Sequence, residues 1–321
     1  MLGTWVVGID LGGTNLKVGL VDAGGAIAAI QTCPTEAQKG PDHFINIVDQ
    51  LVDALCVQAK VSRSASILGA GLGTPGPLDF RKGIILKAAN LPGWVNFPLR
   101  DRMAGKLRVP VVIENDANAA AYGEFIGQRP RASQPSMVLL TLGTGVGAGV
   151  IIDGKVLHGH FDNAGELGHM IVVPNGLPCP CGQRGFLEAY ASAGAIARRF
   201  EQAVLAGESS SVPSGSDAKA ISIGAHQGDA LCRRIWDEAC LYLAIACINI
   251  QHAFNPEVIL LGGGMAEAGE FLLACVRSHF DANRWHLHDD FPRIELARLG
   301  SNAGIIGAAA LAWEKLASAS S

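Results

Sequence analysis

Short apolar runs that end in glycine dominate the start of the chain. Residues 5–10, 16–21 and 26–31 each predict a buried strand. Turns at 11–14 and 22–25, both rich in glycine, join these runs into an antiparallel meander.

The same order returns in the second half of the chain. Residues 137–142 and 146–152 predict strands on either side of the turn Gly143-Thr144-Gly145, and a short third strand begins at Val156. Apolar strand, Gly-Thr turn, strand, Asp/Gly turn and strand therefore form an internal repeat. Each half is expected to begin with a meander and to continue with helices and further strands.

The polar connector 128–136 lies between the two halves and is the predicted domain boundary. A smaller α/β domain is expected to comprise residues 1–127 and an Ala-rich C-terminal helix at about 304–321 that packs back on it. Residues 128–303 form the larger α/β domain. Other predicted elements are helices at 44–59, 117–125 and 239–250, strands at 67–72, 109–113 and 258–261, and a surface loop at 207–218.

Composition narrows the class of protein. A length of 321 residues suffices for two domains with well-buried cores. The net charge of -4, without a basic cluster, argues against a nucleic-acid partner. No apolar stretch reaches the roughly 18 residues of a membrane span, and the first residues lack the features of a signal peptide. Eight scattered cysteines suit a reducing cytosol, so a cytoplasmic protein without a membrane partner is expected.

Three glycine-rich turns follow predicted strands. Residues 12–14 and 143–147, one turn in each half, allow backbone N–H groups to approach an anion without an intervening Cβ. Facing each other, they would hold the phosphates of a nucleotide, and Gly262-Gly263-Gly264 would leave room for adenine. Each turn taken alone favours a plain hairpin. The matched pair, each with a threonine, favours phosphate.

Two other nucleotide-binding motifs are set aside. No G-x-x-x-x-G-K-[ST] sequence occurs, which excludes a P-loop enzyme. Residues 71–76 match G-x-G-x-x-G, but Pro75 and Pro77 stand where a helix should open. No acidic residue ends a second strand about 20 residues further on, so this match does not predict a dinucleotide fold.

Polar residues with catalytic potential follow the strand predicted at 109–113. Asn115 and Asp116 lie at its carboxyl end, where open α/β sheets bind ligands. A buried aspartate there needs a partner or a task. The alternative is a helix N-cap at Asp116, a role that Asn118 also offers.

A second polar group lies in the other half. Glu166 and His169, three positions apart, share one side of a helical turn or lie together in a loop. A single histidine is more often structural than a ligand. Here it precedes Cys179 and Cys181 by ten and twelve positions, and two thiols with one imidazole suit zinc.

Together these motifs closely resemble the ROK family of sugar kinases and repressors, over essentially the whole chain. Residues 10–14 resemble its first phosphate motif, 143–147 its second, and 262–264 its adenosine motif. Residues 114–118 match the block with the catalytic aspartate, and 166–169 match the E-x-G-H signature. The resemblance implies an α/β, two-domain actin-like ATPase (ribonuclease H-like) fold, with sugar and ATP in a central cleft.

The resemblance also implies roles for single residues. Asp116 would be the base that accepts the proton of the attacking sugar hydroxyl, and Asp10 would orient Mg²⁺. The sugar would be held by Gly76, Asn90, Asn115, Asp116, Glu166, His169 and Glu188. ATP and Mg²⁺ would be held by Asp10, Gly12, Gly13, Thr14, Asn15, Thr144, Gly145, Gly147, Gly263 and Gly264. A homodimer is expected, as is common in the family.

One position departs from the family's zinc signature, C-x-C-G-x-x-G-C-x-E. Phe186 replaces the third cysteine, which leaves His169, Cys179 and Cys181 as metal ligands. A structural zinc has four protein ligands. Three outcomes are open: water closes a three-ligand site, a distant ligand folds in, or no zinc binds and Phe186 fills the gap. Without zinc, His169 would change its tautomer and sugar binding would weaken.

The expected function is phosphorylation of a hexose by ATP. Glucose is the expected sugar, because residues 75–79 and 90–94 look most like bacterial glucokinases of the family. Kinases for N-acetylmannosamine, N-acetylglucosamine, fructose or allose share most of these residues. A sugar-sensing repressor would need a helix-turn-helix domain before Asp10, and a non-catalytic relic would account for the lost cysteine. Intact Asp10, Asp116 and both Gly-Thr turns favour the kinase.

Overall fold

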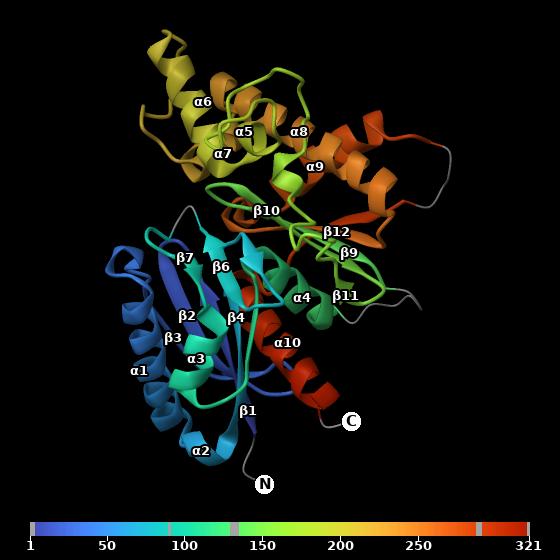
Figure 1. Cartoon of the computed structure of the whole chain (residues 1–321). Helices are drawn as coiled ribbons and strands as arrows, with labels where there is room; N and C mark the ends of the chain where they lie inside the picture. Colours follow the sequence, from blue (N-terminus) through green and yellow to red (C-terminus); the bar gives the residue numbers. More distant parts are fainter. Residues whose placement is uncertain (1–3, 89–90, 129–134, 287–290, 320–321) are drawn as a thin grey trace. The chain divides into compact units, whose positions relative to one another are not determined.

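The computed structural model describes residues 4–88, 91–128, 135–286 and 291–319 (Figure 1). The chain divides into two compact units. One contains residues 1–130, 155–164 and 301–321, and the other contains 131–154 and 165–300. Residues 155–164, expected with the second half, belong to the first unit because the His158 ring bonds Glu114 and packs on Phe80. Most of the connector expected at 128–136 lies outside the described residues.

The first unit is built on a five-stranded sheet. Its strands are β1 (Trp5–Leu11), β2 (Asn15–Val21), β3 (Ile27–Pro34), β4 (Ile67–Thr74) and β8 (Val111–Asn115). They lie in the order β3-β2-β1-β4-β8. The first three form the antiparallel meander expected from the sequence, and β4 and β8 run parallel to β1.

Helices cover both faces of this sheet. α1 (Pro41–Ala59), α2 (Arg63–Ser66) and α3 (Leu99–Leu107) lie apart from α4 (Asp116–Gln128) and α10 (Ala303–Ala319), which pack together (Figure 1). As expected, the C-terminal helix packs on this unit, and glycines in the strands allow it to approach closely. A Cβ at Gly8 would lie 2.1 Å from the Ile305 carbonyl oxygen, and one at Gly71 1.7 Å from that of Ala308.

A small sheet and short helical turns complete the first unit. The small sheet contains β5 (Leu78–Asp79), β6 (Ile84–Lys87) and β7 (Val95–Phe97), and η1 covers Ala37–Lys39. These pieces were not expected, because runs of two to four residues are too short to show a period.

A second five-stranded sheet repeats the first, and all of its strands except the two-residue strand at 155–156 belong to the second unit. β9 (Met137–Leu142), β10 (Val146–Ile152), β11 (Lys155–Val156), β12 (Val258–Gly262) and β13 (Arg293–Leu296) lie in the order β11-β10-β9-β12-β13. β9 is antiparallel to β10 and parallel to β12, and β12 is parallel to β13. This matches the first sheet strand for strand, so the internal repeat predicted from the sequence is confirmed.

Most helices of the second unit contact α8 (Ala230–Phe254), which includes the buried helix predicted at 239–250. Its neighbours are α5 (Glu188–Ala191), α6 (Ala193–Leu205), α7 (Ala218–Gln227) and α9 (Glu270–Asn283). η2 (Leu167–His169), η3 (Gly264–Ala268) and η4 (Gly300–Asn302) are single turns. In the described part of the chain, no helix is both long enough and apolar enough to cross a membrane.

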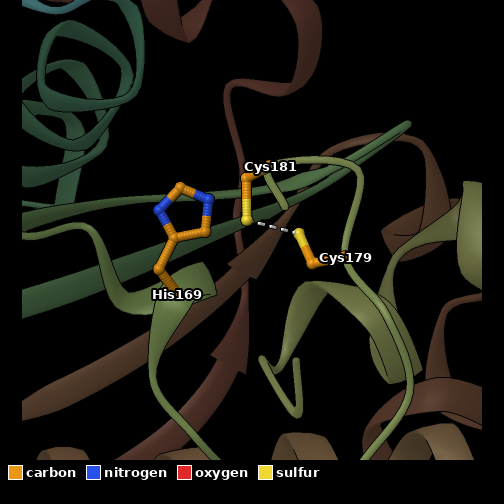
Figure 2. Close-up of side chains that lie close together, drawn as sticks. All are labelled: His169, Cys179 and Cys181. Atoms are coloured by element: carbon orange, nitrogen blue, oxygen red, sulfur yellow. Dashed lines mark hydrogen bonds between the residues drawn. The ribbon is translucent and has the colours of Figure 1, made fainter. Parts of the chain in front are cut away.

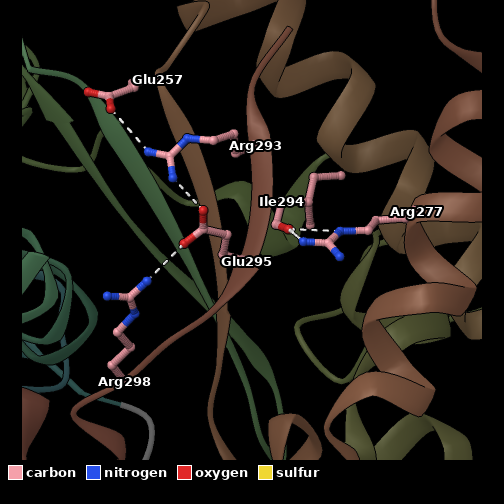
Figure 3. A network of polar contacts seen from close by, with 6 residues as sticks. All are labelled: Glu257, Arg277, Arg293, Ile294, Glu295 and Arg298. Atoms are coloured by element: carbon pink, nitrogen blue, oxygen red, sulfur yellow. Dashed lines mark hydrogen bonds and ion pairs between the residues drawn. The ribbon is translucent and has the colours of Figure 1, made fainter. Parts of the chain in front are cut away.

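An ion-pair chain covers the edge strand β13 (Figure 3). Arg293 bonds Glu257 and Glu295, and Glu295 also pairs with Arg298 at 3.4 Å. The guanidinium of Arg277, on α9, donates two hydrogen bonds to the Ile294 carbonyl oxygen. Charges along an exposed edge discourage pairing with another strand, and Arg277 fixes α9 to that edge.

Candidate active site

Parallel strands bring the predicted polar residues of the first unit to one edge of its sheet. In register, Asp10 on β1 pairs with Gly73 on β4, and Gly73 pairs with Glu114 on β8. Asp10 and the Asn115-Asp116 pair therefore lie at the carboxyl ends of strands separated by one neighbour. Open α/β sheets bind ligands at this edge.

The carboxyl group of Asp10 is largely buried and lies near a second carboxylate, that of Asp116. Burial raises its pKa from 3.8 to about 6, and the nearby charge of Asp116 adds to the rise. Lys17, opposite Asp10 on β2, partly offsets it. Two carboxylates that repel each other favour a cation close by. Since Mg²⁺ is held in proteins by one or two carboxylates together with phosphate oxygens, this pair fits the ion that the family resemblance implies.

Glu114 is a buried hub beneath Asn115 and Asp116. Its Oε1 accepts hydrogen bonds from the backbone N–H of Asn115 at 2.9 Å and from Nδ2 of Asn118 at 3.0 Å. Its Oε2 lies 2.8 Å from Nε2 of His158. The hydrogen bond to Glu114 raises the pKa of His158, against the opposing effect of burial. Both oxygens of this carboxylate thus hold neighbouring groups in place.

His158 was not among the site residues predicted from the sequence. No spacing rule links it to Glu114, 44 positions earlier, and its stretch His158-Gly159-His160 matches no motif. Only Glu114 pointed to such a contact, because a glutamate in a strand with almost no exposed surface requires a partner.

Asn115 caps α4. Its Oδ1 accepts from the backbone N–H groups of Ala117 at 3.0 Å and Asn118 at 3.2 Å. Oδ1 of Asp116 also accepts from Ala117, at 2.8 Å, so the capping role considered for Asp116 is shared with its neighbour. Gly76 faces the amide end of Asn115, since a Cβ there would lie 3.7 Å from Nδ2. Asn90, expected beside them, lies outside the described residues.

The first glycine turn is closed and anchored. Gly12 donates from its backbone to the Asn15 carbonyl oxygen at 3.0 Å. Thr35 holds both ends, with its hydroxyl on the Gly12 carbonyl at 2.7 Å and its backbone N–H on the Thr14 carbonyl at 2.9 Å. Gly13, Thr14 and Asn15 are exposed at the tip. The turn therefore presents its backbone to solvent in a fixed shape.

The second and third glycine turns are neighbours in the other unit. Gly262 pairs with Thr141, so the turns that follow β12 and β9 adjoin. Gly263 has a φ of 82° and approaches Leu142 so closely that a Cβ would lie 2.5 Å from its carbonyl oxygen. Strand packing alone thus requires glycine at 263. Gly264, where η3 begins, has open space around it, and Thr144 is exposed, whereas Gly147 lies within β10.

The E-x-G-H segment is packed on the strand that follows the second turn. A Cβ at Gly168 would lie 2.0 Å from the Val146 carbonyl oxygen, so only glycine permits this contact. Glu166 and His169 flank it and are exposed, with Oε2 of Glu166 3.7 Å from Nδ1 of His169. The structure thus brings the two residues together on a single 3-10 turn, as their spacing predicted.

The predicted metal ligands also meet (Figure 2). One donor atom from each of His169, Cys179 and Cys181 lies within 4.8 Å of the other two, and the two sulfur atoms are 3.0 Å apart. Burial, followed by the hydrogen bond with Cys181, raises the pKa of the Cys179 thiol to about 11. Oε1 of Glu188 lies 3.6 Å from the Cys179 sulfur.

Phe186 occupies the place beside this group. Its ring lies 5.2 Å from that of His169 and packs in a small apolar cluster with Cys179 and Tyr190. Within the described residues, no fourth His, Cys, Asp or Glu joins the three donors. The residues therefore fit a zinc with three protein ligands and an open position, and they do not form a closed four-ligand site.

Comparison with known proteins extends these observations. The model of the ROK family matches residues 6–315. A glucokinase of Halalkalibacterium halodurans is 38% identical over 94% of this chain and 93% of its own length. An N-acetylmannosamine kinase of Escherichia coli O157:H7 is 34% identical over 96% and 98%. A crystal structure of a ROK family glucokinase from Streptomyces griseus, in complex with glucose and AMPPNP, has a TM-score of 0.77 at 32% identity and covers 97% of this chain and 99% of its own. Matched along nearly its whole length, with both sheets repeating one topology, the chain belongs to the ROK family and has the actin-like ATPase fold.

Proposed function

We propose that this protein transfers the terminal phosphoryl group of ATP to a hexose, with glucose as the preferred sugar and Asp116 as the general base. The observation that carries the proposal is the pair Asp10 and Asp116. The two carboxylates lie at the carboxyl ends of strands separated by one neighbour, and their repulsion helps to raise the pKa of Asp10. One carboxylate can serve a cation while the other takes a proton.

The reaction needs few chemical groups. The sugar hydroxyl gives its proton to the Asp116 carboxylate as its oxygen forms a bond to the γ-phosphorus, and the bond to the ADP oxygen breaks. Mg²⁺, when bound, neutralises charge that builds up on the phosphate oxygens. Asp10 would hold that ion, and Glu114 fixes the backbone of Asn115 and the side chain of Asn118 on either side of the base. Phosphoryl transfer depends chiefly on such positioning.

We assign the nucleotide to the glycine turns. The anchored turn 12–15 offers the backbone of its exposed residues Gly13 and Thr14 to phosphate, and the second turn offers that of the exposed Thr144. The open space at Gly264, beside a glycine already fixed by strand packing, suits a flat adenine ring.

We assign the sugar hydroxyls to paired donors and acceptors. Glu166 and His169 are exposed on one turn, and Glu188 keeps Oε1 beside Cys179 while Oε2 is held by Val146. Asn115 uses Oδ1 as a helix cap, which leaves Nδ2 as its donor to the sugar. Gly76 and Asn90 complete the assignment. A hydroxyl both donates and accepts, so this mixture of side chains can satisfy several at once.

The choice of sugar rests on relatives. The glucokinase relative favours glucose, whereas the N-acetylmannosamine kinase, nearly as similar, makes that sugar the main alternative. A panel assay separates them: ADP release is followed with saturating Mg·ATP and glucose, N-acetylmannosamine, N-acetylglucosamine, fructose or allose. We expect the highest kcat/KM with glucose. A higher value with an N-acetyl sugar would replace glucose, and sugar binding without turnover of any hexose would reject the kinase.

A further inference from the structure

A second group of metal-binding side chains lies away from the residues discussed above. Asp237 on α8 and Cys275 and His279 on α9 each place one donor atom within 4.8 Å of the other two. Cys275 and His279 are four positions apart, so they share one face of α9. That face packs against α8.

The distances suit a tetrahedral ion. Oδ1 of Asp237 lies 2.9 Å from Nε2 of His279 and 3.7 Å from Sγ of Cys275. With ordinary bond lengths, a tetrahedral zinc would separate its oxygen and nitrogen ligands by about 3.3 Å and its oxygen and sulfur ligands by about 3.5 Å. These two separations would therefore change by only a few tenths of an ångström on binding, and the sulfur–nitrogen separation is at most 4.8 Å. Without an ion, the same three side chains form an ion pair between His279 and Asp237 and a hydrogen bond from the Cys275 thiol to the Asp237 carboxylate.

The surroundings supply what a metal site needs. His279 is mostly covered, with 24% of its side chain exposed, whereas 63% of the Asp237 side chain is exposed and leaves an entry path from solvent. Beneath them the buried Cys240 lies on α8, three positions after Asp237. The Cys240 thiol forms a hydrogen bond with Cys275. A protonated thiol there can donate to the Cys275 sulfur and orient it, as outer partners of metal ligands commonly do.

We propose that Asp237, Cys275 and His279 bind zinc, with water as the fourth ligand, and that this ion ties α9 to α8. One sulfur, one nitrogen and one oxygen form a borderline donor set, which suits Zn²⁺ and disfavours Mg²⁺ or Ca²⁺. Binding displaces the thiol proton of Cys275 to solvent, and the thiolate then bonds the ion. The site shares no residue with the His169 group and does not depend on the proposed kinase activity.

The test uses the full chain with Cys179 and Cys181 both changed to serine, so that the other thiols cannot bind the probe. The protein is freed of metal with a chelator under reducing conditions and is titrated with Co²⁺ and then Zn²⁺. We expect about one equivalent of each, a thiolate-to-cobalt charge-transfer absorption, and a higher Tm with Zn²⁺. Adding Asp237→Asn or Cys275→Ser should weaken binding by more than about 100-fold, beyond the effect of losing an outer partner.

Controls decide the outcome. Cys33→Ser, at a half-buried thiol of the other unit, should leave binding unchanged, and the melting curve without metal shows whether each variant is folded. The proposal is overturned if the parent variant binds no cobalt, or if Asp237→Asn and Cys275→Ser bind as the parent does. A Cys240–Cys275 disulfide that persists in the purified protein under these reducing conditions would also overturn it.

Discussion

The backbone N–H of Val146 donates a 3.0 Å hydrogen bond to Oε2 of Glu188. This contact joins a residue assigned to the sugar with the turn assigned to phosphate. The same carboxylate leaves no space at Gly145, where a Cβ would lie 2.3 Å from Oε2. Glu188 and the second glycine turn therefore position each other, and a substitution in one is expected to displace the other.

Gly145→Ala should impair both substrates. The new methyl group displaces the Glu188 carboxylate or the turn, and a misplacement of about 1 Å can reduce catalysis about 100-fold. We expect kcat/KM to fall by that order for sugar and for ATP. Gly143→Ala is the matched control, because a Cβ there meets no atom within 4 Å. Equal losses in the two variants would contradict the proposed coupling.

Asp116→Asn should abolish turnover and spare sugar binding. The base acts mainly in the transition state, and asparagine keeps the shape and the hydrogen bond to the Ala117 backbone. We expect sugar affinity, measured by calorimetry, within about tenfold of the parent value. A kcat near that of the parent would remove Asp116 from its role.

The same variant tests the electrostatics of Asp10. Because the Asp116 charge helps to raise the pKa of Asp10 to about 6, its removal should lower that pKa. Carboxyl chemical shifts of Asp10, followed by NMR from pH 4 to 8 without Mg²⁺, measure the change directly. An unchanged pKa would mean that burial alone is responsible.

Asp10 also predicts how stability depends on pH. Its folded pKa lies above its ordinary value of 3.8, so the folded state binds the proton more tightly than the unfolded chain. The free energy of unfolding therefore loses this contribution as the pH rises from about 4 to about 6. Asp10→Asn lacks the titration, and its stability should decline less over that range in urea unfolding. Parallel declines would contradict the raised pKa.

The sequence predicted best what depends on local pattern. β9 and β10 begin and end at the predicted residues, because the polar connector, the Gly-Thr turn and the Asp/Gly turn bound their two apolar runs. Contacts between distant segments left no such signal. The reason for glycine at 71 is a helix more than 200 positions away, and the partner of Glu114 lies in a loop that the repeat assigned to the other half. Motifs located the site residues, but the hydrogen bonds that orient them needed the folded chain.

His158 makes a second pH-dependent contribution to the stability of the first unit. It arises from pairing with Glu114, whereas that of Asp10 arises mainly from burial. Glu114 raises the pKa of His158 above 6.5, so the charged pair stabilises the fold fully below that value. The contribution is lost as the pH rises through the folded pKa. Compared with His158→Gln, the parent protein should thus have its largest excess stability near pH 6 and a smaller one near pH 9. Thermal unfolding at both pH values measures this, and a constant difference would show that the charge has no effect.

Phe186→Cys should convert the His169 group into a tighter zinc site. The parent offers one imidazole and two thiols, and the phenyl ring fills the position beside His169. Cysteine at 186 adds the fourth donor that a closed tetrahedral site requires, so zinc affinity should rise by at least about tenfold. Competition with a chromophoric chelator, in an Asp237→Asn background that removes the α8–α9 group, measures the gain. Phe186→Ser is the control, since it opens the same space without a thiolate. Equal zinc affinity of the serine and cysteine variants would contradict this prediction. It would show that the backbone at 186 does not bring a side-chain ligand to the ion, so that replacement of Phe186 alone cannot complete a four-ligand site.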